Sequence, residues 1–167
     1  MAKAHAHCIT RPMDLYLLVK TLHIVYATVL FGTGLGIAFF FLMGMRSGEP
    51  AMALFAARTT AVADMIFTLT AGIAQPLTGF WLVWQVGYDP FATWLVITYV
   101  LYLVALACWL LVVWLQLRIR DLYAARVRGE AFDEALCRRY FRWWFALGWP
   151  AFLGLVVVFW LMVAKTP

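Results

Sequence analysis

Long apolar runs alternate with short polar segments along this chain, and the pattern predicts its fold. Each run has the roughly 20 or more residues that a helix needs to cross a bilayer. The runs end at helix-breaking segments such as Arg46-Ser-Gly-Glu-Pro50 and Gly87-Tyr-Asp-Pro90. Four transmembrane helices are predicted, at about 14–44, 62–86, 92–117 and 141–164, after a polar tail over 1–13. We therefore expect an all-α protein, an integral membrane four-helix bundle with residues 14–165 as its single domain.

Composition indicates that lipid surrounds most of the chain. Hydrophobic residues make up 66% and charged residues 13%, with a mean hydropathy of +0.88, against about 45–50% and about 25% in soluble domains. Four spans use nearly all of the 167 residues, which leaves no room for a separate soluble catalytic domain. The first run exceeds the core of a signal peptide, about 7–15 residues, so we expect it to be retained. Cys8, Cys108 and Cys137 predict no disulfide framework.

Positive charges predict how the bundle is oriented, because Lys and Arg near span ends stay preferentially cytoplasmic. The first and third loops together hold nine arginines, whereas Lys3, Arg11 and Lys165 lie on the other side. Both termini should therefore face outward, into the periplasm of a bacterial cell whose inner membrane holds the protein. Trp81, Trp84, Tyr88 and Trp94 are expected at the outer interface, and Trp143 and Trp144 at the inner one. The net charge of +5 indicates anionic lipid and no nucleic acid as the partner.

The third loop, Arg118 to Arg142, has two interpretations. Its apolar positions recur among arginines and acids, with a break at Arg128-Gly-Glu130. It could extend spans three and four as a helical hairpin near anionic lipid, or form a solvated, charge-balanced loop.

Few ionisable groups lie inside the spans, and by default such groups mark function or a paired structural contact. They are Lys20, His23 and Asp64, with Gln75 as the chief neutral polar group. Lys20 and His23 are three residues apart, so they share one helix face. An imidazole there could ligate haem iron, with the lysine near a propionate. Alternatively, Lys20 extends to the interface and His23 forms a hydrogen bond between helices.

Depth limits the second ligand of such a haem. His23 lies about nine residues, or about 14 Å, inside the outer boundary. At that level the other spans offer 77–79, Leu101 and Tyr102, and 155–157. His23 is the only histidine in a span, so we expect five-coordinate iron, an unusual ligand, or a haem shared with a partner chain.

Small residues and prolines mark further positions. Gly32 and Gly36, four apart, permit close helix contact, which we favour, although the surface around Gly34 could also accommodate a flat macrocycle. Pro76 should free the carbonyl of Gly72, and Pro150 that of Ala146. For Asp64 we favour a salt bridge with Arg142 over a role in proton transfer. His5, His7 and Cys8 could bind copper or zinc in the tail.

Several segments resemble a known family. Leu15-Tyr-Leu-Leu-Val-Lys-Thr-Leu-His23, the glycine motif at 31–36, Gln75-Pro-Leu-Thr-Gly-Phe-Trp81 and Trp144-Phe-Ala-Leu-Gly-Trp-Pro150 are similar to bacterial predicted integral membrane proteins of unknown function, DUF2269. Lys20-Thr-Leu-His23 more distantly resembles the first helix of haem-binding protoporphyrinogen oxidases and of copper-resistance membrane proteins. That resemblance implies porphyrin or haem binding at His23 and, more weakly, at Lys20. The oxidases also have later histidines, whereas this chain has Ile97 and Tyr99 in the corresponding stretch.

The sequence therefore predicts a membrane protein that binds haem b, with His23 as the axial ligand and Lys20, Gly34, Gln75 and Tyr102 around the cofactor. The iron would exchange electrons with quinone or a periplasmic partner, or serve porphyrin oxidation in an enzymatic version. One alternative is a cofactor-free accessory subunit or small permease. Another is copper handling through the tail and Met162. A homo-oligomer is compatible with each of these functions.

Overall fold

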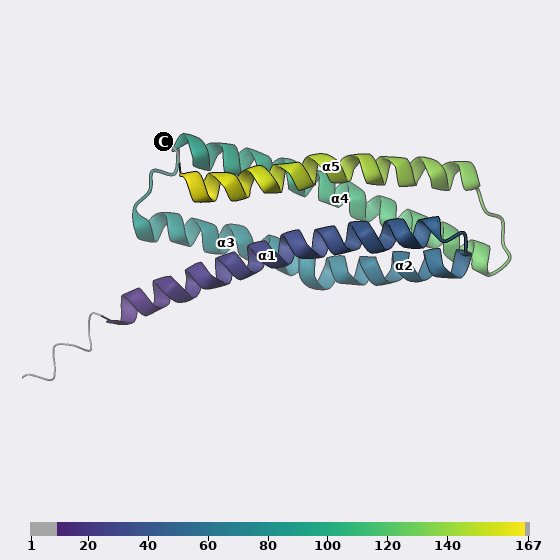
Figure 1. Ribbon diagram of the computed structural model, residues 1–167, viewed down its shortest axis with the longest axis horizontal. Helices are drawn as coiled ribbons and strands as arrows, with labels where there is room; N and C mark the ends of the chain where they lie inside the picture. Colours follow the sequence, from purple (N-terminus) through teal and green to yellow (C-terminus); the bar gives the residue numbers. More distant parts are fainter. Residues whose placement is uncertain (1–9, 166–167) are drawn as a thin grey trace, which may run out of the picture.

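The protein is a bundle of long helices that run roughly side by side (Figure 1). The structure, a computed structural model, describes the backbone of residues 10–165 and the side chains of residues 14–165. Within this part of the chain every regular element is helical. The elements are α1 (Thr10–Arg46), α2 (Pro50–Ala63), η1 (Asp64–Thr68), α3 (Leu69–Val86), α4 (Thr93–Val127) and α5 (Glu134–Ala164). The predicted all-α class is confirmed.

Four helical segments are long and apolar enough to cross a membrane. They comprise 33, 37, 35 and 31 residues, and the second is the continuous helix formed by α2, η1 and α3. At about 1.5 Å per residue, each is longer than the hydrocarbon core of about 30 Å. The helices therefore extend past the predicted spans, chiefly at the end that carries the arginines. The predicted four-helix membrane bundle is confirmed.

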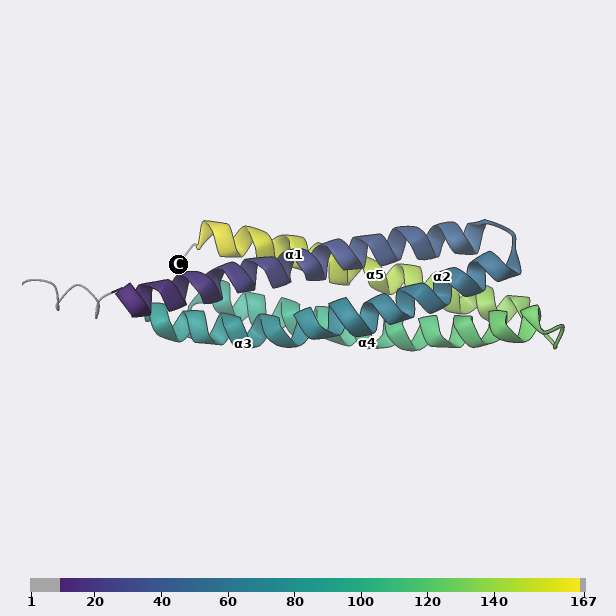
Figure 2. The same cartoon turned by 90° about the horizontal axis from the view of Figure 1, so that it is seen from below.

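Both chain ends in the described part lie at one end of the bundle, and the α1–α2 and α4–α5 connections lie at the other (Figures 1 and 2). The α1–α2 connection is only Ser47–Glu49, so Arg58, expected in a loop, is on α2. The third loop is resolved in favour of the helical hairpin, because α4 continues to Val127 and α5 begins at Glu134. Its turn needs Gly129 at a φ of 76°, which glycine adopts readily.

At this turn Arg128 donates two hydrogen bonds to Glu130, at 2.6 and 2.9 Å. These bonds lower the pKa of the Glu130 carboxyl. Asp133 caps α5 by accepting from the backbone N–H of Leu136 at 2.9 Å. The turn is thus closed by polar contacts of its own.

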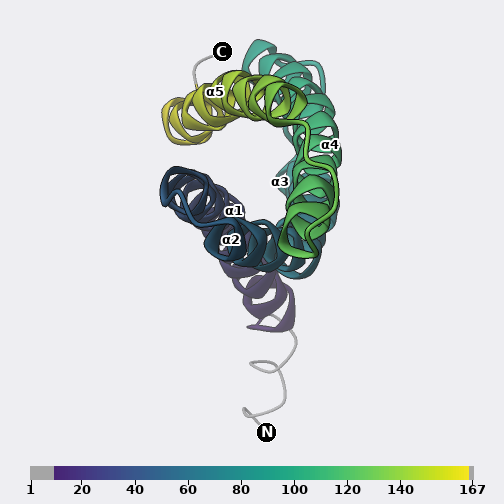
Figure 3. The ribbon, with the colours of Figure 1, turned by 90° about the vertical axis from the view of Figure 1, so that its right-hand side faces the viewer.

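Viewed end-on, the helices form an open ring with a gap between α1 and α5 (Figure 3). The most extensive pairing is between α4 and α5, whereas α1 packs mainly on α2 and α3. A core cluster at the arginine end joins α1, α2, α4 and α5 through Phe41, Ala57, Ile119 and Trp144. A second cluster at the opposite end, around Trp94, Leu95 and Leu161, contains no residue of α1. Helix α1 is therefore fixed to α5 more firmly at the arginine end.

Two of the expected interfacial tryptophans are instead buried. Trp144 is 4% exposed and packs on Phe41, with ring centroids 4.6 Å apart. Trp94 is 6% exposed and packs on Tyr88. Trp84 and Trp143 are exposed, as membrane-interface residues would be. Helix packing therefore uses tryptophans that a hydropathy argument assigns to the headgroup region.

The expected close contact at Gly32 and Gly36 is not formed within the chain. A Cβ added at either residue, or at Gly34, would have no neighbour within 4 Å. Helices α1 and α2 instead come closest at Gly44, where an added Cβ would overlap the Cβ of Ala56. The glycine that allows close packing is therefore the one beside the short α1–α2 connection.

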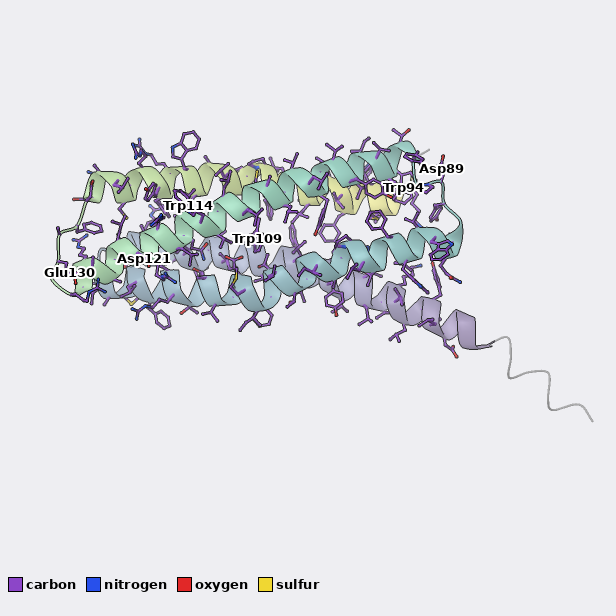
Figure 4. The ribbon with its side chains drawn as sticks, turned by 180° about the vertical axis from the view of Figure 1, so that it is seen from behind. Asp89, Trp94, Trp109, Trp114, Asp121 and Glu130 are labelled. Atoms are coloured by element: carbon purple, nitrogen blue, oxygen red, sulfur yellow. The ribbon has the colours of Figure 1, made fainter. Side chains whose placement is uncertain are left out.

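The outward orientation of the termini is testable with single cysteines in a variant lacking Cys8, Cys108 and Cys137. Asp89 and Glu130 lie at opposite ends of the bundle (Figure 4). We expect Asp89→Cys to react with a membrane-impermeant thiol reagent in intact cells, because the α3–α4 turn should face outward. Glu130→Cys should react only after permeabilisation. The reverse labelling pattern would show that the charge argument gives the wrong orientation.

The packing role of Gly44 predicts a matched pair of variants. Gly44→Ala should destabilise the bundle by about 1–3 kcal/mol, because its methyl group meets the rigid Cβ of Ala56. Gly36→Ala should be neutral or stabilise by up to about 1 kcal/mol, since alanine favours helix and the space is open. Unfolding measured in mixed micelles compares the two. Equal effects would contradict the close approach at Gly44.

Candidate functional site

His23 joins α1 to α3 through a hydrogen bond between its Nδ1 and Thr78 Oγ1, 2.8 Å long. The Thr78 hydroxyl has one proton, which it donates to the carbonyl of Ala74 at 2.7 Å. With its proton donated to Ala74, the hydroxyl accepts from His23, an arrangement that favours the neutral tautomer protonated on Nδ1. The lone pair of Nε2 is then available to a metal or a hydrogen-bond donor.

The surroundings of His23 leave this lone pair open. Nε2 has no hydrogen-bond partner among the described residues. The ring lies against Gly79, where an added Cβ would come within 3.2 Å of Cε1. Lys20, one turn away on α1, is exposed, with its Nζ 5.6 Å from the centre of the Tyr16 ring. It forms no ion pair with any acid in the described part of the chain.

The other predicted cofactor residues lie in two places. The Oε1 atom of Gln75 is buried without a hydrogen-bond partner. Tyr102 donates its hydroxyl proton to the carbonyl of Gly72, the carbonyl that Pro76 leaves without its usual N–H donor. Gly34 and Tyr102 both line a cavity deeper in the bundle, whereas His23, Lys20 and Gln75 do not. The five residues therefore do not form one site.

This cavity lies between α1, α3, α4 and α5 and has a volume of about 640 Å³. Its walls are almost entirely apolar and include seven aromatic side chains: Phe31, Tyr102, Trp109, Trp144, Phe145, Trp149 and Phe152. Leu35 and Trp149 at its edge are more than half exposed, so it opens toward the lipid-facing surface. Its volume is in the range of about 300–1,000 Å³ typical of ligand pockets.

Asp64 is at the inner wall of this cavity and is only 3% exposed. Its Oδ1 accepts a hydrogen bond of 3.0 Å from Trp109 Nε1, and Trp109 lies about midway along α4 (Figure 4). The predicted salt bridge between Asp64 and Arg142 is wrong: the three ion pairs of residues 14–165 do not include Asp64, and Arg142 is exposed. Because the second helix already begins at Pro50, Asp64 lies well inside it, where no arginine of α5 neutralises it.

Asp64 begins a five-residue π-helical turn, η1, which changes the hydrogen bonds of the next residues. The carbonyl of Asp64 accepts from the backbone N–H of Leu69, five residues later. Thr28, Thr60, Thr70, Thr78 and Thr98 all donate their hydroxyls to the carbonyl four residues earlier. Thr68, only 8% exposed, does not, and its Oγ1 has no partner. π turns of this kind occur frequently at functional sites.

A second polar cluster ties three helices together. The Gln116 side chain is fully buried. It accepts from Trp144 Nε1 at 3.1 Å and donates to Thr60 Oγ1 at 2.8 Å. The Thr60 hydroxyl in turn donates a hydrogen bond to the carbonyl of Ala56. Every polar atom named here has a partner, so this cluster is structural.

With this geometry known, comparison with protein families identifies the chain. The family model described as "Predicted integral membrane protein (DUF2269)" matches residues 17–166. The chain belongs to the DUF2269 family. Comparison with curated proteins and with solved structures gives no match. The family description establishes a multi-pass membrane protein and assigns no activity, so the distant resemblance to the oxidases and copper-resistance proteins stays a prediction.

Sequence alone gives no signal for several polar residues of this DUF2269 protein at the cavity and in the neighbouring Gln116 cluster. Trp109, Thr68 and Gln116 are a tryptophan, a threonine and an amide within or beside apolar spans. Such residue types often serve only as packing, so they gave no signal by themselves. The usable signal was Asp64, an acid inside a span, whose partners only the helix packing could identify.

The described part of this DUF2269 protein contains no cluster of side chains that could hold a metal ion by themselves. No group of three His, Cys, Asp or Glu side chains comes together there. The predicted copper motif His5, His7 and Cys8 lies outside the described residues. Met162, its suggested partner, packs on the core cluster around Trp94 and Leu161.

The Tyr102 bond to the carbonyl of Gly72 predicts different effects for two tyrosines on α4. Tyr102→Phe should destabilise the DUF2269 protein by about 0.6 kcal/mol and at most about 1.7 kcal/mol, the range of such bonds in membrane helices. Tyr99→Phe should be neutral or stabilising, because its buried hydroxyl has no partner. Unfolding of both variants in mixed micelles compares them. A larger loss for Tyr99→Phe would contradict this assignment.

Proposed function

We propose that the protein binds haem b in a bacterial inner membrane, with Nε2 of His23 as the axial ligand. The observation that supports this is the His23–Thr78 hydrogen bond. Histidines that ligate metals generally donate their other ring N–H to a fixed acceptor, which sets the tautomer and orients the ring. Thr78 acts in this way on Nδ1, since its own proton goes to Ala74.

The residues around His23 are compatible with the cofactor. Gly79 contributes no side chain, so α3 packs directly against the Cε1 edge of the imidazole and helps to hold the ring in place. Lys20 has a free cation one turn from His23, suited to a propionate. His23 is the sole histidine of residues 10–165, so a single chain would hold five-coordinate iron.

Haem supplies one-electron chemistry, and the residues of this chain would bind and orient it. His23 would hold the iron, and Thr78 would keep the imidazole neutral and correctly turned. The redox partner would be a membrane quinone or a periplasmic protein. Because the helices hold the site within lipid, water would be largely excluded from it.

The absorption spectrum of the protein purified from haem-replete cells tests this proposal. We expect a Soret band with reduced α and β bands at near-stoichiometric yield. His23→Ala should abolish the pigment with the bundle still folded, since one such contact is worth only about 0.6 kcal/mol. Thr78→Val should weaken haem binding about 10- to 100-fold, the usual effect of removing such a partner.

Thr28→Val provides the matched control, because the exposed Thr28 donates only to the carbonyl of Ile24 on its own helix. It should retain the pigment. A wild-type protein that stays colourless after haem addition would overturn the proposal and favour a cofactor-free accessory subunit or small permease. Pigment retained in folded His23→Ala would refute the ligand assignment.

A further inference from the structure

The cavity between α1 and α5 has a polar inner wall that the rest of the protein does not satisfy. Asp64 Oδ2 and Thr68 Oγ1 are both buried there with no partner at hydrogen-bond distance in the described chain, although the Thr68 and Gln116 side chains lie near enough to the Asp64 carboxyl to interact with it. Within a membrane, an unpaired buried polar group costs free energy that water cannot repay. The residues that carry these two atoms are each more than nine-tenths buried.

The two atoms differ in what they accept and donate. Trp109 occupies Asp64 Oδ1, so Oδ2 is the acceptor that is left. The hydroxyl of Thr68 is available as a donor, because it does not form the bond to the carbonyl four residues earlier that the other threonines form, and it lies in the π turn that alters the local backbone geometry. A ligand hydroxyl satisfies both, since it can donate to Asp64 and accept from Thr68.

The rest of the cavity limits the ligand to a neutral, lipid-soluble molecule. Its lining contains no lysine, arginine or histidine, and Asp64 is the one acid in it. An anionic headgroup or the propionates of a haem would therefore be buried without a cation. Aromatic side chains, among them Trp109, Trp144 and Trp149, favour a flat ring near the polar wall. The leucines at the lipid-facing edge suit an aliphatic tail.

We propose that this cavity binds a lipid-soluble hydroquinone, whose ring hydroxyl donates to Asp64 and accepts from Thr68. The tail leaves between α1 and α5, past the half-exposed Leu35 and Trp149 at the edge of the cavity. The site is separate from His23, which is not part of its lining. It goes beyond the haem proposal and does not depend on it.

Titration of the purified protein in lipid nanodiscs with decylubiquinol, followed by tryptophan fluorescence, tests the site. We expect saturable binding that the dimethyl ether of the same compound, which lacks the hydroxyl donor, fails to reproduce. Thr68→Val and Asp64→Asn should each weaken binding about 3- to 10-fold, as expected for the loss of one neutral hydrogen bond in a site without a cation. Thr70→Val is the matched control, because its hydroxyl is exposed and bonds within its own helix.

A second pair of variants tests whether the ligand occupies the cavity, by filling its volume with a side chain. The paired control shows whether a similar substitution nearby disturbs folding. Gly34→Leu would fill space next to the ligand and should abolish binding, since nothing opposes a side chain there. Gly32→Leu, equally open but outside the lining, should bind normally. Wild-type affinity in Gly34→Leu and Thr68→Val, or equal binding of the dimethyl ether, would overturn the proposal.

The same experiment separates this site from the haem. His23→Ala should bind decylubiquinol with unchanged affinity while it loses any pigment. A colourless protein that binds the hydroquinone would contradict the haem proposal and support this one. A pigmented protein that does not bind the hydroquinone would support the haem proposal and contradict the hydroquinone site.

Discussion

The hydrogen bonds of Gln116 hold together the part of the bundle on which the rest depends. Apolar packing gives little net drive for helix association in lipid, because lipid tails are as apolar as the side chains. The Gln116 amide, fully buried, bonds to Thr60 on α2 and Trp144 on α5 from its position on α4. These three helices, with Phe41 of α1 packed on Trp144, form a fixed end at the arginine side.

The fixed end explains why a cavity exists beyond it. Helix α1 contributes to the core cluster around Phe41 and Ile119, but not to the one around Trp94 and Leu161. Phe31 bridges to α5 by stacking on Phe152, with ring centroids 4.9 Å apart. In the region between these two aromatic contacts, Gly34 of α1 and Gly148 of α5 line the cavity but have no side chains to fill it. The 640 Å³ cavity is thus the result of two helices held apart at defined points.

The π turn at Asp64 supplies the chemistry of this cavity. Within this turn the hydroxyl of Thr68 does not form the bond to the carbonyl four residues earlier that an ordinary helical threonine forms. Trp109 fixes one carboxylate oxygen and leaves the other toward the cavity. His23 has a comparable arrangement near the outer side, where Thr78 fixes one ring nitrogen and leaves the other. The two positions share one arrangement but differ in chemistry: His23 is an imidazole with the Lys20 cation one turn away, whereas Asp64 is an acid without a cation beside it.

The sequence by itself determined the all-helical class and the four membrane crossings, and it identified His23 and Asp64 as ionisable groups within the spans, because hydropathy and the cost of an ionisable group in lipid are properties of each local segment. It also located the free carbonyl of Gly72, which follows from Pro76 alone. Only the tertiary structure decided that Asp64 pairs with Trp109 and not Arg142, that Gly44 and not Gly36 is the tight contact, and that Gly34 and Tyr102 line a cavity apart from His23. These outcomes depend on how far each helix extends and how it is rotated. Since side chains from every helix set both, no single segment of the sequence specifies them.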